Sequence, residues 1–196
     1  VIVGGGPCGA TAATDLAQKG LSVLLLDRAG RIKPCGGAIP PVLVKEFAIP
    51  DSLIVARINS ARMVSPAERK VDMPIDGGYV GMVDREDFDE WLRKRAALAG
   101  AERRTGTFDF LARDANGTAV IHYTARDPEG VESPVEERAR AVIGADGARS
   151  NVARQAIPGG EDVECVFAYQ EIVAAPAGGV AREYDGTRCD VYYQGR

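Results

Sequence analysis

The sequence lacks the residues that most metal sites and disulfide frameworks require. It has one histidine and four cysteines, Cys8, Cys35, Cys165 and Cys189, and the cysteines form no C-x-x-C pair. Because zinc is usually held by Cys and His at short, fixed spacings, we expect no metal site. Scattered cysteines are typical of free thiols in a reducing compartment, so we expect the protein to reside in the cytoplasm.

The chain also lacks a basic charge excess and a long apolar run. Its formal net charge is −4, whereas proteins that bind nucleic acid usually carry a basic stripe. Nucleic acid is therefore not expected as a partner. No apolar run approaches the ~20 residues of a membrane span. With 196 residues, 45% of them hydrophobic, the composition is typical of one globular domain, or one and a part.

Both ends of the sequence indicate a fragment. Val1 stands within a strand-like run without an initiator methionine, and Arg196 follows another strand-like run. We expect a few residues to be missing in front and a long segment behind.

A glycine-rich turn between a strand and a helix is the first motif. Residues 1–3 are apolar and β-branched, and they lead into G-x-G-x-x-G at Gly4, Gly6 and Gly9. Gly4 permits a tight turn, Gly6 lets a pyrophosphate approach the backbone, and Gly9 lets the helix pack close to the strand. Residues 10–19 favour a helix, whose free N-terminal N–H groups attract phosphates. This pattern predicts a dinucleotide-binding βαβ unit.

An acidic residue follows at the spacing that such a unit requires. Residues 21–27 predict a buried strand that ends at Asp27, close to the ~20 residues past the last glycine at which a carboxylate binds ribose hydroxyls. A carboxylate there repels a 2′-phosphate, so the tightly held nucleotide is predicted to be NAD-like or FAD, not NADP. The alternative is a βαβ unit whose glycines are incidental.

The middle of the chain predicts mixed elements. Residues 28–41 are punctuated by Gly and Pro and are expected to form an irregular loop. Helices are predicted from Pro41 to Phe47 and over 85–99 with Asp84 as N-cap. Strands are predicted over 60–65, 70–75 and 79–83, and an antiparallel meander over 101–142.

A second motif follows the meander. Residues 141–147 predict a buried strand that ends in Gly-Ala-Asp-Gly, after which Ser150 can cap a short helix. The composition shifts at Pro158, and residues 165–173 and 189–193 resemble strands of another sheet. We therefore predict two domains, 1–158 and the beginning of a second, β-rich domain over 159–196.

The two motifs together resemble the para-hydroxybenzoate-hydroxylase-like FAD enzymes, in which the Asp-Gly element lies beside the flavin. Three further runs, residues 31–41 (RIKPCGGAIPP), 81–89 (GMVDREDFD) and 166–169 (VFAY), resemble the geranylgeranyl reductases of chlorophyll and bacteriochlorophyll synthesis. The resemblance extends from end to end. It implies an α/β fold: a Rossmann-like FAD-binding domain with an antiparallel β-meander, followed by the start of a substrate domain.

The resemblance also implies the chemistry. Such enzymes bind FAD, take hydride from NADPH, and saturate isolated C=C bonds of a geranylgeranyl chain, giving phytyl. The chain is carried on a (bacterio)chlorophyll or as the diphosphate. An isolated alkene has no carbonyl to polarise it, so the reduction needs a positioned flavin and a nearby proton source. The apolar substrate implies peripheral association with the photosynthetic membrane. The oligomeric state stays open.

The resemblance implies a set of cofactor-binding residues. They are Gly4, Gly6, Pro7, Cys8 and Gly9 in the pyrophosphate loop; Asp27 and Arg28 at the ribose; Cys35, Gly36 and Gly37 in the Pro-Cys-Gly-Gly loop; Arg85 at the start of a helix; and Gly144, Asp146 and Gly147 in the Asp-Gly element. Cys8 departs from the family pattern, and we expect its side chain to serve packing.

Cys35 is the predicted catalytic residue. A thiol with a pKa near ~8.5 is largely protonated at neutral pH, so it can supply a proton. The alternative is a small residue chosen for its size between turn-forming neighbours. Three other functions also stay open: an FAD-dependent aromatic monooxygenase, an archaeal-type geranylgeranyl lipid reductase, and a nucleotide-binding regulatory module without chemistry.

Overall fold

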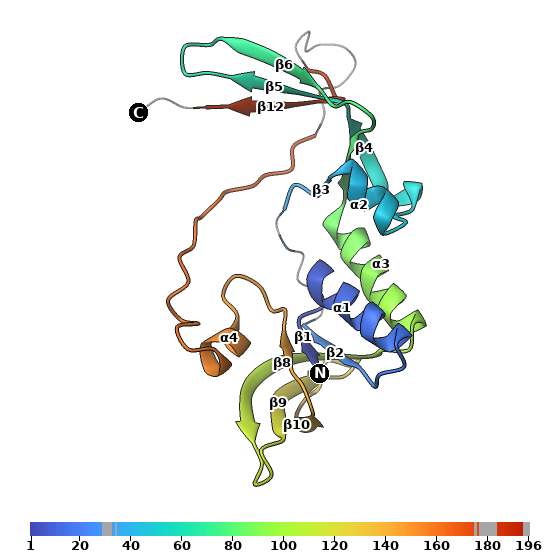
Figure 1. Cartoon of the computed structure of the whole chain (residues 1–196), viewed down its shortest axis with the longest axis vertical. Coiled ribbons are helices and arrows are strands. Elements are labelled where there is room, and N and C mark those ends of the chain that lie inside the picture. The colour runs from blue at the N-terminus through green and yellow to red at the C-terminus, as the bar shows by residue number, and fades with distance from the viewer. Residues whose placement is uncertain (29–32, 34, 175, 177–183, 194–196) are drawn as a thin grey trace. The chain divides into compact units, whose positions relative to one another are not determined.

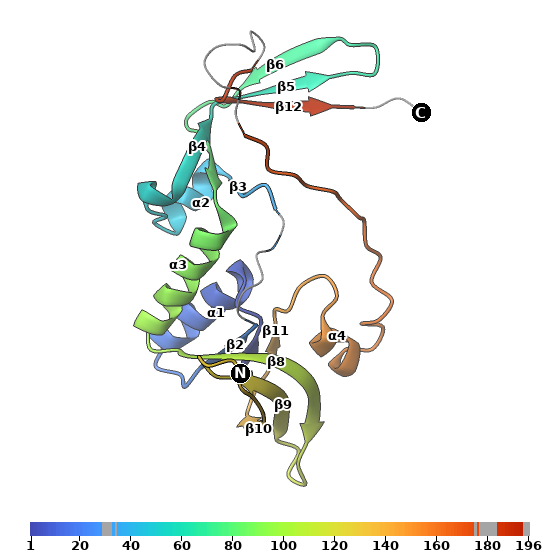
Figure 2. The ribbon, with the colours of Figure 1, turned by 180° about the vertical axis from the view of Figure 1, so that it is seen from behind.

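The computed structural model of the chain describes residues 1–28, 33, 35–174, 176 and 184–193. Its contacts group the chain into two compact units. Unit 1 comprises Val1–Ile32 and Asp89–Phe167, and unit 2 comprises Lys33–Phe88 and Ala168–Arg196. Figures 1 and 2 show the elements of both units from opposite sides. The predicted domain division at residue 158 does not coincide with these contact units and stays a prediction.

Unit 1 is built on a six-stranded sheet in the order β10-β9-β8-β2-β1-β11. Strand β1 runs parallel to both β2 and β11, and β2 runs parallel to β8, whereas β8, β9 and β10 form an antiparallel meander. This arrangement confirms the predicted α/β fold with a meander. The strands are β1 (Ile2–Val3), β2 (Leu24–Asp27), β8 (Glu102–Arg113), β9 (Ala119–Arg126), β10 (Glu132–Ala139) and β11 (Ile143–Gly144).

Helix α1 (Pro7–Gln18) lies against β1 and β2. Its inward face carries small residues, and Ala10 and Ala13 are fully buried. Small side chains let the helix axis approach the sheet closely, which places the start of α1 directly above the end of β1. The core of this unit is a cluster of buried residues from the sheet and from helix α4 (Asn151–Ala156): Val3, Leu26, Phe108, Ile121, Tyr123 and Val152.

Helix α3 (Arg85–Leu98) begins in unit 2 and continues into unit 1. Asp84 caps it as predicted, since its Oδ1 accepts a hydrogen bond from the backbone N–H of Glu86 at 3.1 Å. Acidic residues fill the first turn, where the positive end of the helix dipole favours them. The predicted bounds of this helix are correct to within one residue.

Unit 2 holds two three-stranded sheets, β12-β5-β6 and β3-β7-β4. Helix α2 begins at a proline, as predicted. The elements are β3 (Ala38–Ile39), α2 (Pro41–Glu46), a 3-10 turn (Asp51–Leu53), β4 (Ile54–Ile58), β5 (Ser60–Val64), β6 (Lys70–Pro74), β7 (Val80–Val83) and β12 (Arg188–Tyr192).

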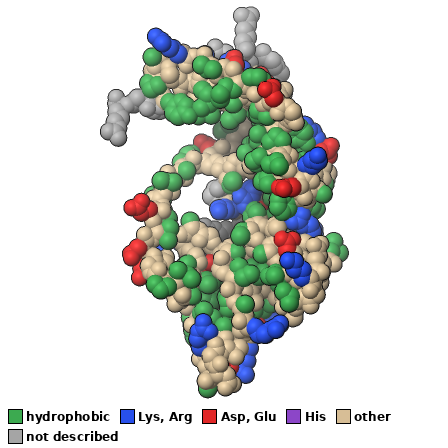
Figure 3. Space-filling model, in the orientation of Figure 1, with side chains coloured by type: hydrophobic (Ala, Val, Ile, Leu, Met, Phe, Trp, Pro, Cys, Tyr) green, Lys and Arg blue, Asp and Glu red, His purple; other side chains and the backbone are tan. Residues whose placement is uncertain are grey.

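Two predictions about strands and one about a loop were wrong. Residues 165–173, all of them described, contain no strand, and their apolar side chains are exposed, with Val166 at 97% and Ile172 at 91%. Hydrophobic side chains lie on the surface along this part of the chain in the space-filling view (Figure 3). The loop over 28–41 is not wholly irregular, because β3 pairs with β7. The strand that ends at Gly144 is exposed rather than buried, because β11 lies at the edge of its sheet.

Candidate dinucleotide-binding site

The glycine-rich turn follows β1 and is shaped by contacts that exclude side chains. Gly4 has a φ of +105°, and a Cβ atom there would lie 2.3 Å from the carbonyl oxygen of Ala145. A Cβ atom at Gly9 would lie 1.9 Å from the carbonyl oxygen of Gly4. Both glycines are therefore required by close backbone approach, as the motif predicts. The contact with Ala145 also brings the two sequence motifs side by side.

The N-terminus of α1 presents a bare surface. Gly6 is the N-cap and provides no side-chain hydrogen bond, and Pro7 occupies the first turn. A Cβ atom at Gly6 would meet nothing within 4 Å in the described part of the chain, its chain neighbours apart, so this space is open among those residues. The first N–H groups of any helix have no partner within the helix, and the dipole favours an anion there. The residues therefore fit a pyrophosphate.

Cys8 lies in the first turn of α1 and its side chain is exposed. The prediction that this thiol serves packing is wrong. The buried face of the helix is formed by other residues, among them Gly9 and Ala10. Whether Cys8 contacts a cofactor stays a prediction.

Asp27 ends β2 and turns its carboxylate back to the glycine turn. Its Oδ2 accepts a hydrogen bond from the backbone N–H of Gly5 at 2.7 Å and lies 3.7 Å from Nη1 of Arg93. Burial raises the pKa of Asp27, while Arg93, the Gly5 N–H and Arg28 oppose that rise. A Cβ atom at Gly5 would lie 2.3 Å from Oδ2, so a larger residue would force the carboxylate to shift. The carboxylate thus lies beside the turn, where the sequence predicts it.

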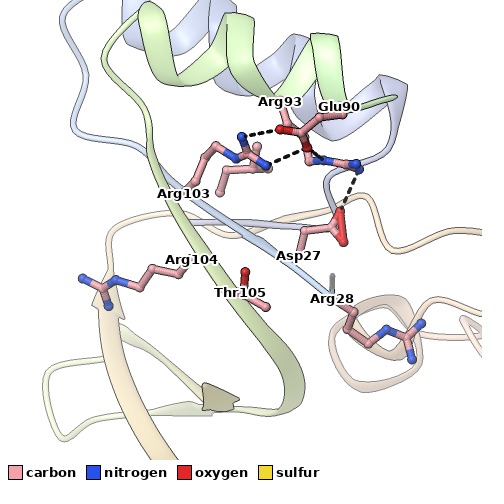
Figure 4. Close-up of a pocket in the computed structure, with 8 residues that line it drawn as sticks. Asp27, Arg28, Glu90, Arg93, Arg103, Arg104 and Thr105 are labelled. Atoms are coloured by element: carbon pink, nitrogen blue, oxygen red, sulfur yellow. Dashed lines mark hydrogen bonds and ion pairs between the residues drawn. The ribbon is translucent and has the colours of Figure 1, made fainter. Parts of the chain in front are cut away.

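A series of ion pairs and hydrogen bonds connects Asp27 to helix α3 and strand β8 (Figure 4). Arg93 Nε donates to Glu90 Oε2 at 3.0 Å, and Arg93 Nη1 donates to the carbonyl oxygen of Gly5 at 3.2 Å. Arg103 on β8 donates to both oxygens of Glu90, at 3.0 and 2.9 Å. These two arginines, Arg103 first, lower the pKa of Glu90.

None of the sequence motifs includes Glu90, Arg93 or Arg103. The spacing of Glu90 and Arg93 indicates an ion pair on one helix face, but nothing in it names Asp27 as the next partner. With Asp27, Arg28 and Thr105 they line an open pocket of about 130 Å³. The predicted ribose residues Asp27 and Arg28 therefore share a pocket that is rich in arginine.

The Asp-Gly element lies beside the glycine turn and holds the start of α4. The Asp146 carboxylate accepts a hydrogen bond from Ser150 Oγ at 2.5 Å and from the backbone N–H of Asn151 at 2.7 Å. Ser150 Oγ in turn accepts from the N–H of Ala153 at 2.9 Å, so the predicted cap is confirmed. Gly144 packs against Val152, and Gly147 has a φ of +93°. A cofactor contact by this element stays a prediction.

The remaining predicted residues, Cys35, Gly36, Gly37 and Arg85, belong to unit 2. Residues 29–32 and 34 of the predicted loop over 28–41 lie outside the described residues. Gly37 has a φ of +67°, and a Cβ atom there would lie 2.0 Å from the carbonyl oxygen of Val83, so this glycine is required by the pairing of β3 with β7. The structure therefore groups the predicted site residues into two sets, one in each unit.

Cys35 is exposed and lies in a positively polarised setting. The backbone N–H of Gly37 lowers the pKa of the Cys35 thiol most, burial opposes it, and Arg85 and Lys33 lower it further. A lower pKa brings the thiol closer to neutral pH, where general acids transfer protons most effectively. The role of Cys35 as a proton donor stays a prediction.

Within the described ranges, no group of three or more His, Cys, Asp or Glu side chains is placed to hold a metal ion. No helix in the described part of the chain combines the length and the apolar character needed to cross a bilayer.

Comparison with known proteins agrees with this geometry. Residues 2–45 match the model of an NAD(P)-binding Rossmann-like domain. Over 195 residues, the chain is 58% identical to a geranylgeranyl diphosphate reductase of Rhodobacter capsulatus, a match that covers 100% of this chain and 48% of the relative. Over 187 residues, it is 40% identical to a chloroplastic geranylgeranyl diphosphate reductase of Oryza sativa, with 89% of this chain and 39% of the relative covered.

A solved structure of a related protein has a similar fold. A geranylgeranyl bacteriochlorophyll reductase-like protein from Thermoplasma acidophilum matches with a TM-score of 0.74 and 25% identity, and the match covers 98% of this chain and 49% of that chain. The chain thus spans about half the length, or less, of the relatives that it matches.

Proposed function

Because this chain belongs to the geranylgeranyl reductase family, we propose that it forms the FAD-binding part of an enzyme that reduces geranylgeranyl groups. The enzyme saturates C=C bonds of the geranylgeranyl chain, with NADPH as the hydride donor and phytyl as the product. The substrate is a geranylgeranylated (bacterio)chlorophyll or geranylgeranyl diphosphate. The bound flavin supplies the redox chemistry, and the residues of this chain bind and orient it.

One observation carries the proposal: an open helix N-terminus and an acidic side chain meet at one glycine turn. Among the described residues, and apart from its chain neighbours, nothing lies within 4 Å of the position of a Cβ atom at Gly6, and the Asp27 carboxylate is hydrogen-bonded to the neighbouring Gly5. The first feature accommodates a pyrophosphate and the second a ribose diol, which are adjacent groups in FAD. Gly4 and Gly9 keep the turn compact enough for both to lie together.

The remaining residues of the proposed site belong to two further parts of the chain. Gly144, Asp146 and Gly147 lie next to the turn through the Gly4–Ala145 contact and are proposed to border the dinucleotide path. Gly36, Gly37 and Arg85 are proposed to contact the flavin side. We assign the proton for the second alkene carbon to Cys35, whose lowered pKa favours transfer near neutral pH. Pro7, Cys8 and Arg28 complete the proposed cofactor contacts.

The cellular setting follows from the substrate. A geranylgeranyl chain esterified to a pigment is held in a membrane, so we propose a cytoplasmic enzyme that works at the surface of the photosynthetic membrane. Flotation of the full chain with pigment-containing vesicles tests this setting, and recovery wholly in the soluble fraction would refute it.

Mass spectrometry of the pigment tail tests the reaction. The full chain, incubated with NADPH and geranylgeranylated pigment in the absence of oxygen, should add pairs of hydrogens to the tail. A product that appears only with oxygen and carries a hydroxyl group would identify the aromatic monooxygenase instead. Reduction of geranylgeranyl glycerophospholipids in preference to pigments would identify the lipid reductase. Bound flavin without any product would identify the regulatory module.

A further inference from the structure

Arg93 on α3 contacts three groups that belong to different parts of the site. Its Nη1 donates to the carbonyl oxygen of Gly5 at 3.2 Å and lies 3.7 Å from Asp27 Oδ2, while its Nε donates to Glu90 at 3.0 Å. The Arg93 and Asp27 side chains are each about one quarter exposed, so solvent screens this pair only in part. One guanidinium therefore joins the carboxylate to the backbone of the glycine turn.

Glu90 determines which way Arg93 points. Its carboxylate receives hydrogen bonds from Arg93 and from both terminal nitrogens of Arg103. Arg103 comes from β8, the strand next to β2 in the sheet. The chain Arg103–Glu90–Arg93 thus connects the sheet across α3 to Asp27, as the dashed lines in Figure 4 show. Arg93 reaches the turn through the Gly5 carbonyl oxygen.

Arg93 contacts one group at the proposed ribose position, the Asp27 carboxylate, and one beside the proposed pyrophosphate position, the Gly5 carbonyl. Gly5 N–H and Arg93 both approach Oδ2 of Asp27, so one oxygen fixes the position of a carboxylate that also lines the pocket. A ribose hydroxyl needs such an acceptor at a defined position. The Gly5 carbonyl, in turn, belongs to the peptide just before Gly6, where the pyrophosphate is proposed to approach.

We propose that Arg93 is a positioning residue for the adenosine ribose of FAD, which it orients by fixing the Asp27 carboxylate and the glycine turn together. Glu90 and Arg103 hold Arg93 in place for this task. The inference rests on the proposed function, because it presumes that the dinucleotide is FAD. It concerns a helix residue more than eighty positions after the turn, which no part of the nucleotide fingerprint includes.

Removal of Arg93 should also change how FAD binding depends on pH. Burial disfavours the Asp27 carboxylate, and Arg93 is the largest of the influences that favour it. Without Arg93, protonation of Asp27 should occur at higher pH and abolish ribose binding there. The charged groups around Asp27 are Arg93, Asp89 and Glu90 on α3, Arg28 after β2, and Arg103 and Arg104 on β8.

The experiment uses the full chain and three variants, with FAD affinity measured by quenching of flavin fluorescence between about pH 5 and pH 8. R93Q removes the charge, R93K keeps the charge but not the planar fork, and E90Q releases Arg93 from its support. K94Q is the matched control, because Lys94 is the exposed neighbour on the same helix. Thermal unfolding of each apoprotein is recorded beside the affinity.

We expect R93Q to weaken FAD binding about tenfold at neutral pH and to raise the pH at which affinity is half lost. R93K should keep the wild-type pH profile with affinity between the two, since one ammonium cannot span the groups that a guanidinium reaches. E90Q should weaken binding less than R93Q does, and K94Q should bind as the wild type does.

Wild-type affinity in R93Q would overturn the inference and leave the proposed function intact. So would a loss of affinity with an unchanged pH profile and a lowered unfolding temperature, because that result means a structural role only. If R93Q does not fold, wild-type affinity in both R93K and E90Q would overturn the inference. A wild-type chain that binds no FAD would overturn the proposed function and the inference with it.

Discussion

Replacing Gly6 or Gly9 by alanine should damage the protein in two different ways, although the two glycines belong to one motif. The reason is the surroundings of the added methyl group. At Gly9 it would lie 1.9 Å from the carbonyl oxygen of Gly4, whereas at Gly6 it would meet no described residue within 4 Å other than its chain neighbours. Gly9→Ala should therefore impair folding, and Gly6→Ala should impair cofactor binding alone.

The expected loss of stability in Gly9→Ala is the difference between two opposing effects. Alanine is favoured over glycine within a helix by about 1 kcal/mol. Overpacking of a tight contact costs ~1–3 kcal/mol. Because the clash at Gly9 involves the backbone oxygen of Gly4, which has no flexible side chain to yield, the upper end of that range applies. The free energy of unfolding should fall by about 2 kcal/mol.

The expected effect of Gly6→Ala on folding is close to zero. Gly6 is the N-cap of α1 and has a φ of −71°, which alanine adopts without strain. Alanine is a poorer N-cap than glycine. It also stabilises the folded state by a comparable amount, ~0.4–1 kcal/mol, because it lowers the conformational entropy of the unfolded chain. A methyl group in the open space would, however, keep a pyrophosphate from the backbone. Loss of one charge-assisted hydrogen bond, ~1.5–3 kcal/mol, would weaken FAD binding about ten- to a hundredfold.

Two measurements on the full chain separate these effects. Urea unfolding of the apoproteins, followed by circular dichroism, reports stability, and flavin fluorescence titration reports affinity. The reasoning about close approach is refuted if the Gly9→Ala apoprotein is as stable as the wild type. The assignment of the open space to pyrophosphate is refuted if Gly6→Ala binds FAD as tightly as the wild type.

Three further predictions concern titration and capping. Burial raises the pKa of Asp27 in the folded chain, so the apoprotein should lose stability as the pH rises from ~4 through that pKa. Asp27→Asn should abolish this loss in urea titrations. A variant with the pH dependence of the wild type would contradict this prediction. Ser150→Ala removes the hydrogen bond to the N–H of Ala153 and should lower the free energy of unfolding by ~1 kcal/mol, whereas equal unfolding midpoints would argue against the cap. Arg85→Gln should raise the pKa of Cys35, so that iodoacetamide alkylates this thiol more slowly at neutral pH; an equal rate would exclude Arg85 from its electrostatic surroundings.

The parts of the site that lie close together in sequence could be predicted from it. The turn around Gly4, Gly6 and Gly9 and the carboxylate of Asp27 follow from a short motif in which each residue type has one physical task. The same holds for Ser150 as the cap of α4. In each case the interacting groups are local, or their spacing is dictated by one strand–helix–strand unit.

The parts that depend on sheet order could not be predicted. Arg103 reaches Glu90 because β8 pairs with β2, and no local pattern announces that pairing. The apolar run over 165–173 has strand propensity, but a strand also needs a partner, and in the described part of the chain β12 pairs with β5 instead. The Asp146 carboxylate holds the start of α4, a use that its motif alone does not reveal.

The position of β1 between β2 and β11 has a consequence for how the protein is made. Ile2 pairs with Leu25 on one side and with Ile143 on the other, so β1 leaves the ribosome long before β11, one of its two neighbours in the sheet. Chain closure over such a long span slows folding. The glycine turn is backed by Ala145 only after that closure, which makes flavin capture a late event in the maturation of the nascent polypeptide.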